Sequence, residues 1–125
     1  MKTIYLAHSV TNGDQNLQKI RALISCLEKR KSMIIQPTSN LLPDTLAAVS
    51  LKSIEKSDCV IADITTYSHG VGFELGYAYA LGKDIVVICE VCAKDRVSKF
   101  ILGLFPNIIF YNDQADLEVK IVSRL

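Results

Sequence analysis

One nearly continuous apolar run, Cys59-Val60-Ile61-Ala62-Asp63-Ile64, constrains the fold of this chain more than any other feature. Its residues do not alternate between apolar and polar, as they would in a strand with one face in water. A short apolar run of this kind is typical of a parallel strand that helices cover on both faces. The run therefore predicts an α/β sheet with helices above and below it.

Strand and helix patterns alternate along the rest of the chain. The expected strands are Thr3–Ala7, Ser32–Gln36, Cys59–Ile64, Asp84–Cys89 and Asn107–Tyr111. The expected helices are Gln15–Lys29, one that begins at Pro43 and Asp44, one that carries Glu74 and ends at Gly82, a short one over Val97–Leu102, and one that begins near Asp113. This order predicts a three-layer, doubly wound, five-stranded parallel sheet of the Rossmann or flavodoxin-like kind.

Length and composition predict one domain over residues 1–125, because 125 residues with 50% hydrophobic content suit one core. The net charge of +1 offers no field that would attract nucleic acid or a membrane surface. No stretch resembles a signal peptide or a membrane span. With four cysteines and no secretory signal, we expect a reduced, cytoplasmic protein.

Polar side chains follow three of the expected strands, where ligands bind in open parallel sheets. They are His8, Ser9, Thr11 and Asn12 after the first strand; Asp63, Thr65, Thr66, Tyr67, Ser68 and His69 after the third; and Glu90 and Arg96–Lys99 after the fourth. Hydroxyl groups predominate, and such groups can hold a phosphate together with the amides of a helix N-terminus.

Glu74 is the strongest candidate for chemistry. We expect it at the start of a helix, where the amides and the dipole would keep its carboxylate ionised. Gly70 and Gly72 are expected to let the backbone turn tightly and approach a ligand closely. Such a carboxylate can bind, act as a base or attack a substrate.

The stretch Asp58–Gly76, centred on Ser68-x-Gly70-Val71-Gly72-Phe73-Glu74-Leu75-Gly76, resembles the 2'-deoxynucleoside 5'-phosphate N-hydrolases, within the wider nucleoside 2-deoxyribosyltransferase group. Tyr5-x-x-x-Ser9, Arg96-Val97-Ser98 and Gly103 also match, so the resemblance covers nearly the whole chain. It implies a cofactor-independent homodimer that cleaves (deoxy)nucleoside 5'-monophosphates to free base and sugar 5-phosphate.

The resemblance also implies a role for each matching residue. Glu74 stands where the family has its nucleophile, which forms a glycosyl ester that water hydrolyses. Tyr5 matches a tyrosine beside the sugar, and Ser9 and Ser68 match serines that hold the 5'-phosphate. Ser98 matches a serine that the neighbouring subunit contributes to the same site. Serine at position 68, where the transferases tend to have aspartate, favours a phosphorylated substrate.

Three positions depart from the family pattern. The second catalytic acid falls at Ser50, a phosphate-binding arginine is replaced by Thr11, and a neighbouring glycine by His8. Positive charge for the phosphate would then come from His8, His69, Arg96 or Lys99. Asp63 is the candidate to take over part of the missing acid's role, and its alternative role is to cap the following turn.

Other interpretations stay open at this point. One is transfer of deoxyribose to a second base, and another is a non-catalytic nucleotide-binding module, which the changes at Ser50 and Thr11 favour. A dehydrogenase is disfavoured, because the Gly70-x-Gly72 pair does not follow the first strand. Cys89 and Cys92 have redox spacing but fit packing better. No metal is expected, because His8 and His69 lack a spaced third ligand.

Overall fold

The computed structural model describes residues 1–9, 14–36 and 40–125, and for residues 14–16 the backbone alone. Within them, one sheet contains the strands β1 (Lys2–Ala7), β2 (Ser32–Ile35), β3 (Cys59–Asp63), β4 (Asp84–Glu90) and β5 (Ile109–Tyr111). All neighbouring strands are parallel, in the order β2-β1-β3-β4-β5. This is the flavodoxin-like order of a doubly wound sheet, so the predicted fold is confirmed.

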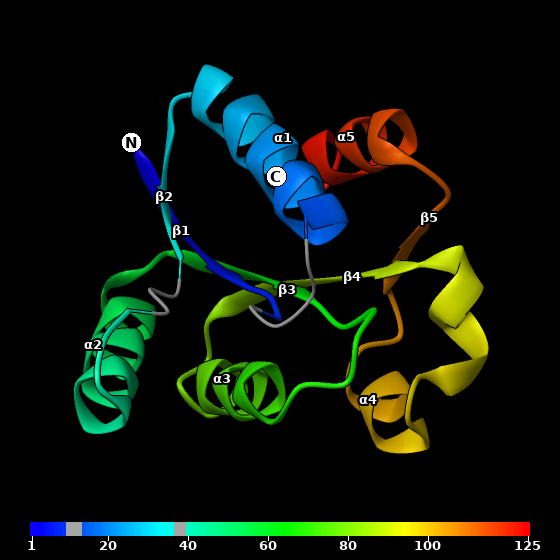
Figure 1. Cartoon of the computed structure of the whole chain (residues 1–125). Coiled ribbons are helices and arrows are strands. Elements are labelled where there is room, and N and C mark those ends of the chain that lie inside the picture. Colours follow the sequence, from blue (N-terminus) through cyan, green and yellow to red (C-terminus); the bar gives the residue numbers. More distant parts are fainter. Residues whose placement is uncertain (10–13, 37–39) are drawn as a thin grey trace.

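Helices cover both faces of the sheet and make three layers (Figure 1). The helices α1 (Asp14–Lys29) and α5 (Gln114–Val122) lie on one face. The helices α2 (Pro43–Lys56), α3 (His69–Ala80) and α4 (Lys99–Leu104) lie on the other. A 3-10 helix, η1 (Val91–Arg96), follows β4 and was not predicted from the sequence.

Each face of the sheet has its own apolar core, and alternation along a strand assigns each side chain to one of them. Ile4 and Leu6 join the core that packs against α1 and α5, whereas Tyr5 and Ala7 join the core against α2 and α3. In β3, Ile61 belongs to the first core and Ala62 to the second. Strand register therefore decides which polar side chains can meet at the edge of the sheet.

The observed bounds of the strands differ from the predicted ones by at most two residues. The strand β5 begins at Ile109 instead of residue 107, and β4 runs to Glu90. The helix α3 begins at His69, directly after its N-cap Ser68, and a left-handed Gly82 follows it with φ of 72°. Gly82 thus ends this helix as predicted, because glycine adopts a positive φ without steric cost.

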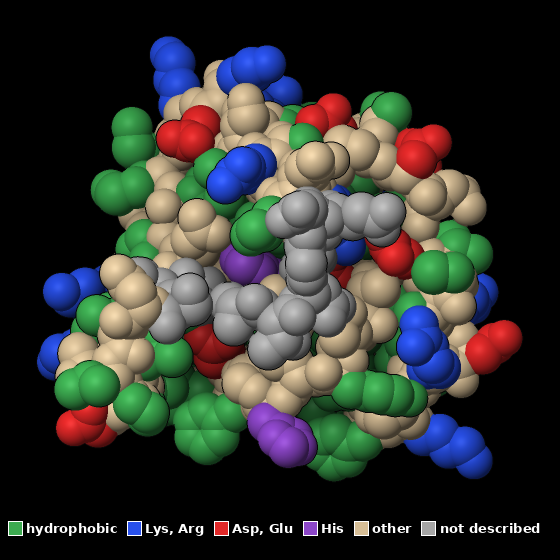
Figure 2. Space-filling view, viewed as in Figure 1, with side chains coloured by type: hydrophobic (Ala, Val, Ile, Leu, Met, Phe, Trp, Pro, Cys, Tyr) green, Lys and Arg blue, Asp and Glu red, His purple; other side chains and the backbone are tan. Residues whose placement is uncertain are grey.

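Charged side chains of both signs are interspersed on the described part of the face in Figure 2, which is viewed as in Figure 1. They lie mainly around its rim, with apolar side chains between them. None of the described helices is both long and apolar enough to cross a membrane.

Candidate active site

A cavity of about 490 Å³ opens between β1, α2 and α3, and its size suits a small-molecule ligand. The end of β1, the helix α2 and the N-terminal half of α3 provide its walls. The lining residues are His8, Ser9, Pro43, Leu46, Ala47, Ser50, Leu51, Ser68, Gly70, Val71, Phe73 and Glu74. The cavity thus brings together four predicted binding residues, His8, Ser9, Ser68 and Gly70, with the predicted nucleophile.

Tyr5 and Glu74 form a buried pair beside this cavity. The Tyr5 phenol donates a hydrogen bond to Oε2 of Glu74. Only 1% of Tyr5 and 8% of Glu74 is exposed. Burial raises the pKa of the Glu74 carboxyl, while the hydrogen bond from Tyr5 and the nearby His8 ring oppose that rise. The pair therefore places a poorly hydrated carboxylate, oriented by a phenol, at the wall of the cavity.

The expectation that Glu74 lies in the first turn of its helix is wrong. The helix α3 starts at His69, so Glu74 lies in its second turn, and the first turn holds no acidic residue. Stabilisation by the helix dipole falls off within the first turn. Burial dominates instead, and it raises the pKa of Glu74 where the dipole would have lowered it.

Ser50 joins the pair from α2. Burial and the hydrogen bond to Glu74 raise the pKa of the Tyr5 phenol, and a hydrogen bond with Ser50 opposes them. A phenol with a raised pKa keeps its proton at neutral pH and acts as a donor. The position predicted to have lost its carboxylic acid thus lies in the cavity wall, next to the residue that holds Glu74.

His8 and Ser9 extend the site from the end of β1. His8 is buried, and its ring nitrogens lie near two acceptors of the chain. Its Nδ1 lies 3.1 Å from the Ser9 carbonyl oxygen and its Nε2 lies 3.2 Å from Oε1 of Gln36. The ring is thus held in place at the cavity wall by contacts on both of its nitrogens.

Ser68 caps α3, since its Oγ accepts a hydrogen bond of 3.3 Å from the Val71 N–H. The hydroxyl proton can still be donated to a ligand. Gly70 and Gly72 lie inside the helix, so the expected tight turn at these glycines is wrong. Gly82 is the described glycine with a positive φ. A β-carbon at Gly70 would meet the Ser68 Oγ at 3.8 Å, and one at Gly72 would meet nothing within 4 Å.

Ser98 lies apart from the larger cavity. It caps α4 by accepting a hydrogen bond of 3.1 Å from the Ile101 N–H. It lines a smaller cavity of about 160 Å³ together with Ser68, Gly72 and Arg96. Ser68 borders both cavities, whereas within one chain Ser98 borders the smaller cavity and not the one that contains Glu74.

Asp63 does not join Glu74, because it pairs in register with Ile88 and faces α1 and α5. Its Oδ2 lies 3.0 Å from Lys19 Nζ and accepts a hydrogen bond of 3.0 Å from the Tyr111 hydroxyl. Its Oδ1 accepts a hydrogen bond of 3.0 Å from the Thr65 N–H. The structure therefore supports the turn-capping role and does not place this carboxylate where it could replace the missing acid.

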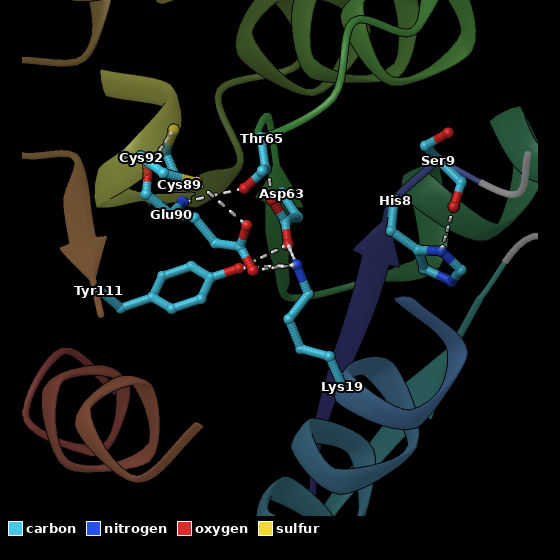
Figure 3. A network of polar contacts seen from close by, with 9 residues as sticks. All are labelled: His8, Ser9, Lys19, Asp63, Thr65, Cys89, Glu90, Cys92 and Tyr111. Atoms are coloured by element: carbon cyan, nitrogen blue, oxygen red, sulfur yellow. Dashed lines mark hydrogen bonds and ion pairs between the residues drawn. The ribbon is translucent and has the colours of Figure 1, made fainter. Parts of the chain in front are cut away.

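Figure 3 shows Asp63 within a polar network that is separate from His8 and Ser9. Lys19 also lies 3.5 Å from Glu90, whose N–H donates a hydrogen bond of 2.9 Å to Thr65 Oγ1. Although burial lowers the pKa of Lys19, the charge of Asp63 and the hydrogen bond to Tyr111 raise it above its ordinary value. The network fixes the start of the loop that carries Ser68, so it positions the site from the opposite face of the sheet.

The apolar wall of the cavity is the part of the site that was not predicted. It comes from α2 and α3, through Pro43, Leu46, Ala47, Leu51 and Phe73. The apolar face of α2 was recognisable from its helical spacing, but spacing does not distinguish a face that lines a cavity from one that packs in the core. Phe73 is 66% exposed, and that exposure has no signature in the sequence.

One part of the predicted site, Thr11 and Asn12 after β1, lies outside the described residues. Among the described residues, no three histidine, cysteine, aspartate or glutamate side chains are grouped so that they could hold a metal ion.

Comparison with known proteins gives a consistent set of relatives. The model of the family described as nucleoside 2-deoxyribosyltransferase matches residues 4–104. A Methanosarcina mazei protein named "Putative 2'-deoxynucleoside 5'-phosphate N-hydrolase 1" is 30% identical over 112 residues, covering 82% of this chain and 68% of the relative. The 5-hydroxymethyl-dUMP N-hydrolase of Rattus norvegicus is 25% identical over 130 residues, covering 94% and 80%.

Solved structures share the fold. A CMP N-glycosidase from Clostridium botulinum superposes with a TM-score of 0.80 at 25% identity, covering 96% of this chain and 98% of that one. A 2-deoxyribosyltransferase from Bacillus psychrosaccharolyticus has a TM-score of 0.63 at 22% identity, covering 93% and 90%. The second likeness bears on the fold alone.

Proposed function

Because the chain belongs to the nucleoside 2-deoxyribosyltransferase family, we propose that it hydrolyses the N-glycosidic bond of (deoxy)nucleoside 5'-monophosphates to free base and sugar 5-phosphate. The buried Tyr5–Glu74 pair at the wall of the cavity carries this proposal. The names of the two curated relatives and of the Clostridium botulinum structure support an N-glycosidase.

Glu74 acts as the nucleophile in two steps. Its carboxylate attacks C1' of the sugar and displaces the base, and water then hydrolyses the glycosyl ester through a second oxocarbenium-like transition state. Burial favours this role, because a carboxylate with few water molecules around it loses little solvation when it attacks. Tyr5 is a positioning residue that holds the carboxylate through its hydrogen bond to Oε2.

Ser9, Ser68 and the first amides of α3 hold the 5'-phosphate. The start of α3 borders the cavity at Gly70, and the helix dipole favours an anion there. His8 contributes the basic ring of a site whose described lining contains no arginine or lysine. The hydroxyl groups and the imidazole together take the role of the family's phosphate-binding arginine, which is Thr11 in this chain.

Two copies of the chain complete the site. In this proposal Ser98 of one copy contacts the phosphate held by Ser9 and Ser68 of the other. The position of Ser98 supports this arrangement, because Ser98 is exposed on the protomer, where a second copy could contact it, and does not line the cavity that contains Glu74 in its own chain. Sedimentation of the wild type should then show a dimer, and Ser98→Ala should weaken nucleotide binding. A monomer with full affinity for nucleotide would contradict this arrangement.

Transfer of deoxyribose to a second base is the other candidate, because the family model carries that description. The two reactions share the Glu74 ester and differ only in whether water or a base intercepts it. A binding module without catalysis is a third candidate, favoured by the serine at position 50. Ser68 favours the hydrolase, because a serine accepts a phosphorylated sugar where an aspartate would repel it.

Base release from ribo- and deoxyribonucleoside 5'-monophosphates tests these candidates. The matching nucleosides test the need for phosphate, and an added acceptor base tests transfer. Glu74→Ala should abolish release, while Glu28→Gln, which changes an exposed glutamate of α1, should leave it unchanged. Release that needs a second base would favour the transferase, and nucleotide binding without any release would favour the binding module.

A further inference from the structure

Among the described residues of one chain, the cavity lining contains a nucleophile and no second carboxyl group that could protonate the departing base. We propose that the base leaves as an anion, so that this chain selects nucleotides by the stability of that anion. The inference rests on the proposed N-glycosidase function. It identifies the substrate class as nucleotides of acidic bases, such as uracil and its 5-substituted relatives with electron-withdrawing groups.

Glu74 is the only carboxyl group among the described residues that line the cavity. It cannot attack C1' as a carboxylate and also donate a proton in the same step. Asp63, the nearest acid in the sequence, faces the other side of the sheet and is engaged by Lys19. The segments 10–13 and 37–39 contain no aspartate, glutamate or histidine in the sequence, and Asp14, of which the backbone alone is described, begins α1 on the face of the sheet opposite α2 and α3.

The remaining proton-bearing groups of the wall are poor acids or are engaged by the chain. The Tyr5 phenol donates to Glu74, and its burial makes it a weaker acid than an exposed tyrosine. Both ring nitrogens of His8 lie within hydrogen-bond distance of acceptors of the chain, Ser9 and Gln36. Ser50 has an aliphatic hydroxyl, which does not act as a general acid at neutral pH.

The chemistry balances without an enzymatic acid. A carboxylate oxygen of Glu74 forms a bond to C1', and the electron pair of the breaking C1'–N bond goes to the base nitrogen. The released anion takes a proton from water. A second water molecule then attacks C1', the electron pair of the ester bond returns to Glu74, and the proton lost by that water restores neutrality.

This mechanism ranks the bases by their acidity. Uracil carries an imide, which delocalises negative charge over two carbonyl groups, and a 5-fluoro substituent stabilises the anion further. Cytosine lacks the imide and leaves well only when it is protonated. The chain should therefore disfavour cytidine monophosphate, although the structural relative from Clostridium botulinum is named for cleaving CMP.

The test is kcat/KM for base release from a series of nucleotides of one sugar that carry 5-fluorouracil, uracil, thymine and cytosine. We expect kcat/KM to fall by about tenfold for each unit by which the pKa of the free base rises, because nearly a full negative charge develops on the base in the transition state when no acid assists. The parameter kcat/KM isolates departure of the base from the later hydrolysis of the ester.

Ser50→Asp adds the missing acid at a position that touches Tyr5 in the cavity wall. Two carboxyl groups in one buried site cannot both ionise, so one of them stays protonated at neutral pH and can protonate the base. The fall in kcat/KM should shrink to about threefold or less per unit of base pKa. Ser50→Asn, of similar shape but without an acid, should keep the steep dependence.

The outcomes separate this inference from the proposed function. A steep dependence in the wild type supports the inference even if Ser50→Asp fails to fold. A flat dependence, with cytosine released as fast as uracil, overturns it and leaves the N-glycosidase in place. Absence of release from every base overturns the proposed function, and the inference with it.

Discussion

Replacing Tyr5 by phenylalanine should destabilise the protein in a way that depends on pH. The change removes one hydroxyl group from a residue that is 1% exposed and leaves the ring in the core. It deprives the carboxylate of Glu74 of the phenolic hydrogen bond that orients it. The carboxylate is 8% exposed, so water replaces this donor poorly.

The size of the effect follows from the charge of Glu74. A buried hydrogen bond to a charged group contributes about 2 kcal/mol, and one to a neutral group contributes about 1 kcal/mol. The ionised fraction of Glu74 grows as the pH rises, so the larger value applies towards about pH 8 and the smaller one towards about pH 4. The wild type and the variant should therefore differ by about 2 kcal/mol in unfolding free energy at about pH 8, which corresponds to about 8 °C in Tm for a domain of this size.

The sign of the pH dependence comes from the same pair. Burial holds the folded-state pKa of Glu74 above its ordinary value, and the hydrogen bond from Tyr5 limits that rise. Removing the bond raises the folded-state pKa further. A raised folded-state pKa stabilises the fold at low pH, and this contribution is lost as the pH rises through that value. The variant should thus lose more stability than the wild type between about pH 4 and about pH 8.

Urea unfolding at both pH values measures this difference directly. Tyr79→Phe is the matched control, because Tyr79 is half exposed on α3, the helix that carries Glu74, and its ring contact with Phe105 survives the change. The control should differ from the wild type by less than about 0.5 kcal/mol. An equal loss for Tyr5→Phe at both pH values would refute the assignment of the hydrogen bond to an ionised Glu74.

Three further predictions concern Glu74 and the network behind the site. Burial raises the pKa of Glu74, and the nucleophile must be ionised to attack. On acidification, kcat/KM should therefore begin to fall at a higher pH than it would with an exposed glutamate. A pH–rate profile that falls at the ordinary pKa of glutamate would contradict this. Glu74→Gln should abolish base release. It should also raise the urea midpoint at about pH 8, because it removes a buried charge whose folded-state pKa is raised. An unchanged or lower midpoint would show that the charge of Glu74 does not destabilise the fold. Lys19→Met should lower the free energy of unfolding by about 3 kcal/mol in urea, because it leaves the Asp63 carboxylate buried without its cation. The double variant with Asp63→Asn should recover most of that stability. If it does not, the loss does not come from the unpaired Asp63 charge.

The strands were predictable from the sequence because short apolar runs such as Cys59–Ile64, bounded by polar turn residues, are typical of buried strands and are too short for most helices. Their ends were less certain, since β5 needs pairing with β4 to define its start and only Ile109–Tyr111 pair. The helix η1 has no apolar period of its own, and six residues of 3-10 structure leave no pattern that distinguishes them from a loop.

The sequence predicted most of the residues that line the cavity, but it predicted their relative positions less well. Gly70 and Gly72 suggested a turn because glycine disfavours helices, yet Val71, Leu75 and Ala78 pack into the core and stabilise the helix through them. The position of Asp63 depends on register, because one step along β3 moves a side chain from the face of Glu74 to the opposite face. Burial, which sets the pKa of Glu74, is a property of the folded chain alone.

Trapping of the glycosyl ester tests the central claim most directly. A nucleoside 5'-monophosphate with fluorine at C2' of the sugar slows hydrolysis of the ester, because the fluorine destabilises the oxocarbenium-like transition state. Peptide mapping by mass spectrometry should then find one sugar phosphate per chain, attached to Glu74, with release of an equal amount of base. Release of base with no adduct, or an adduct on another residue, would contradict Glu74 as the nucleophile.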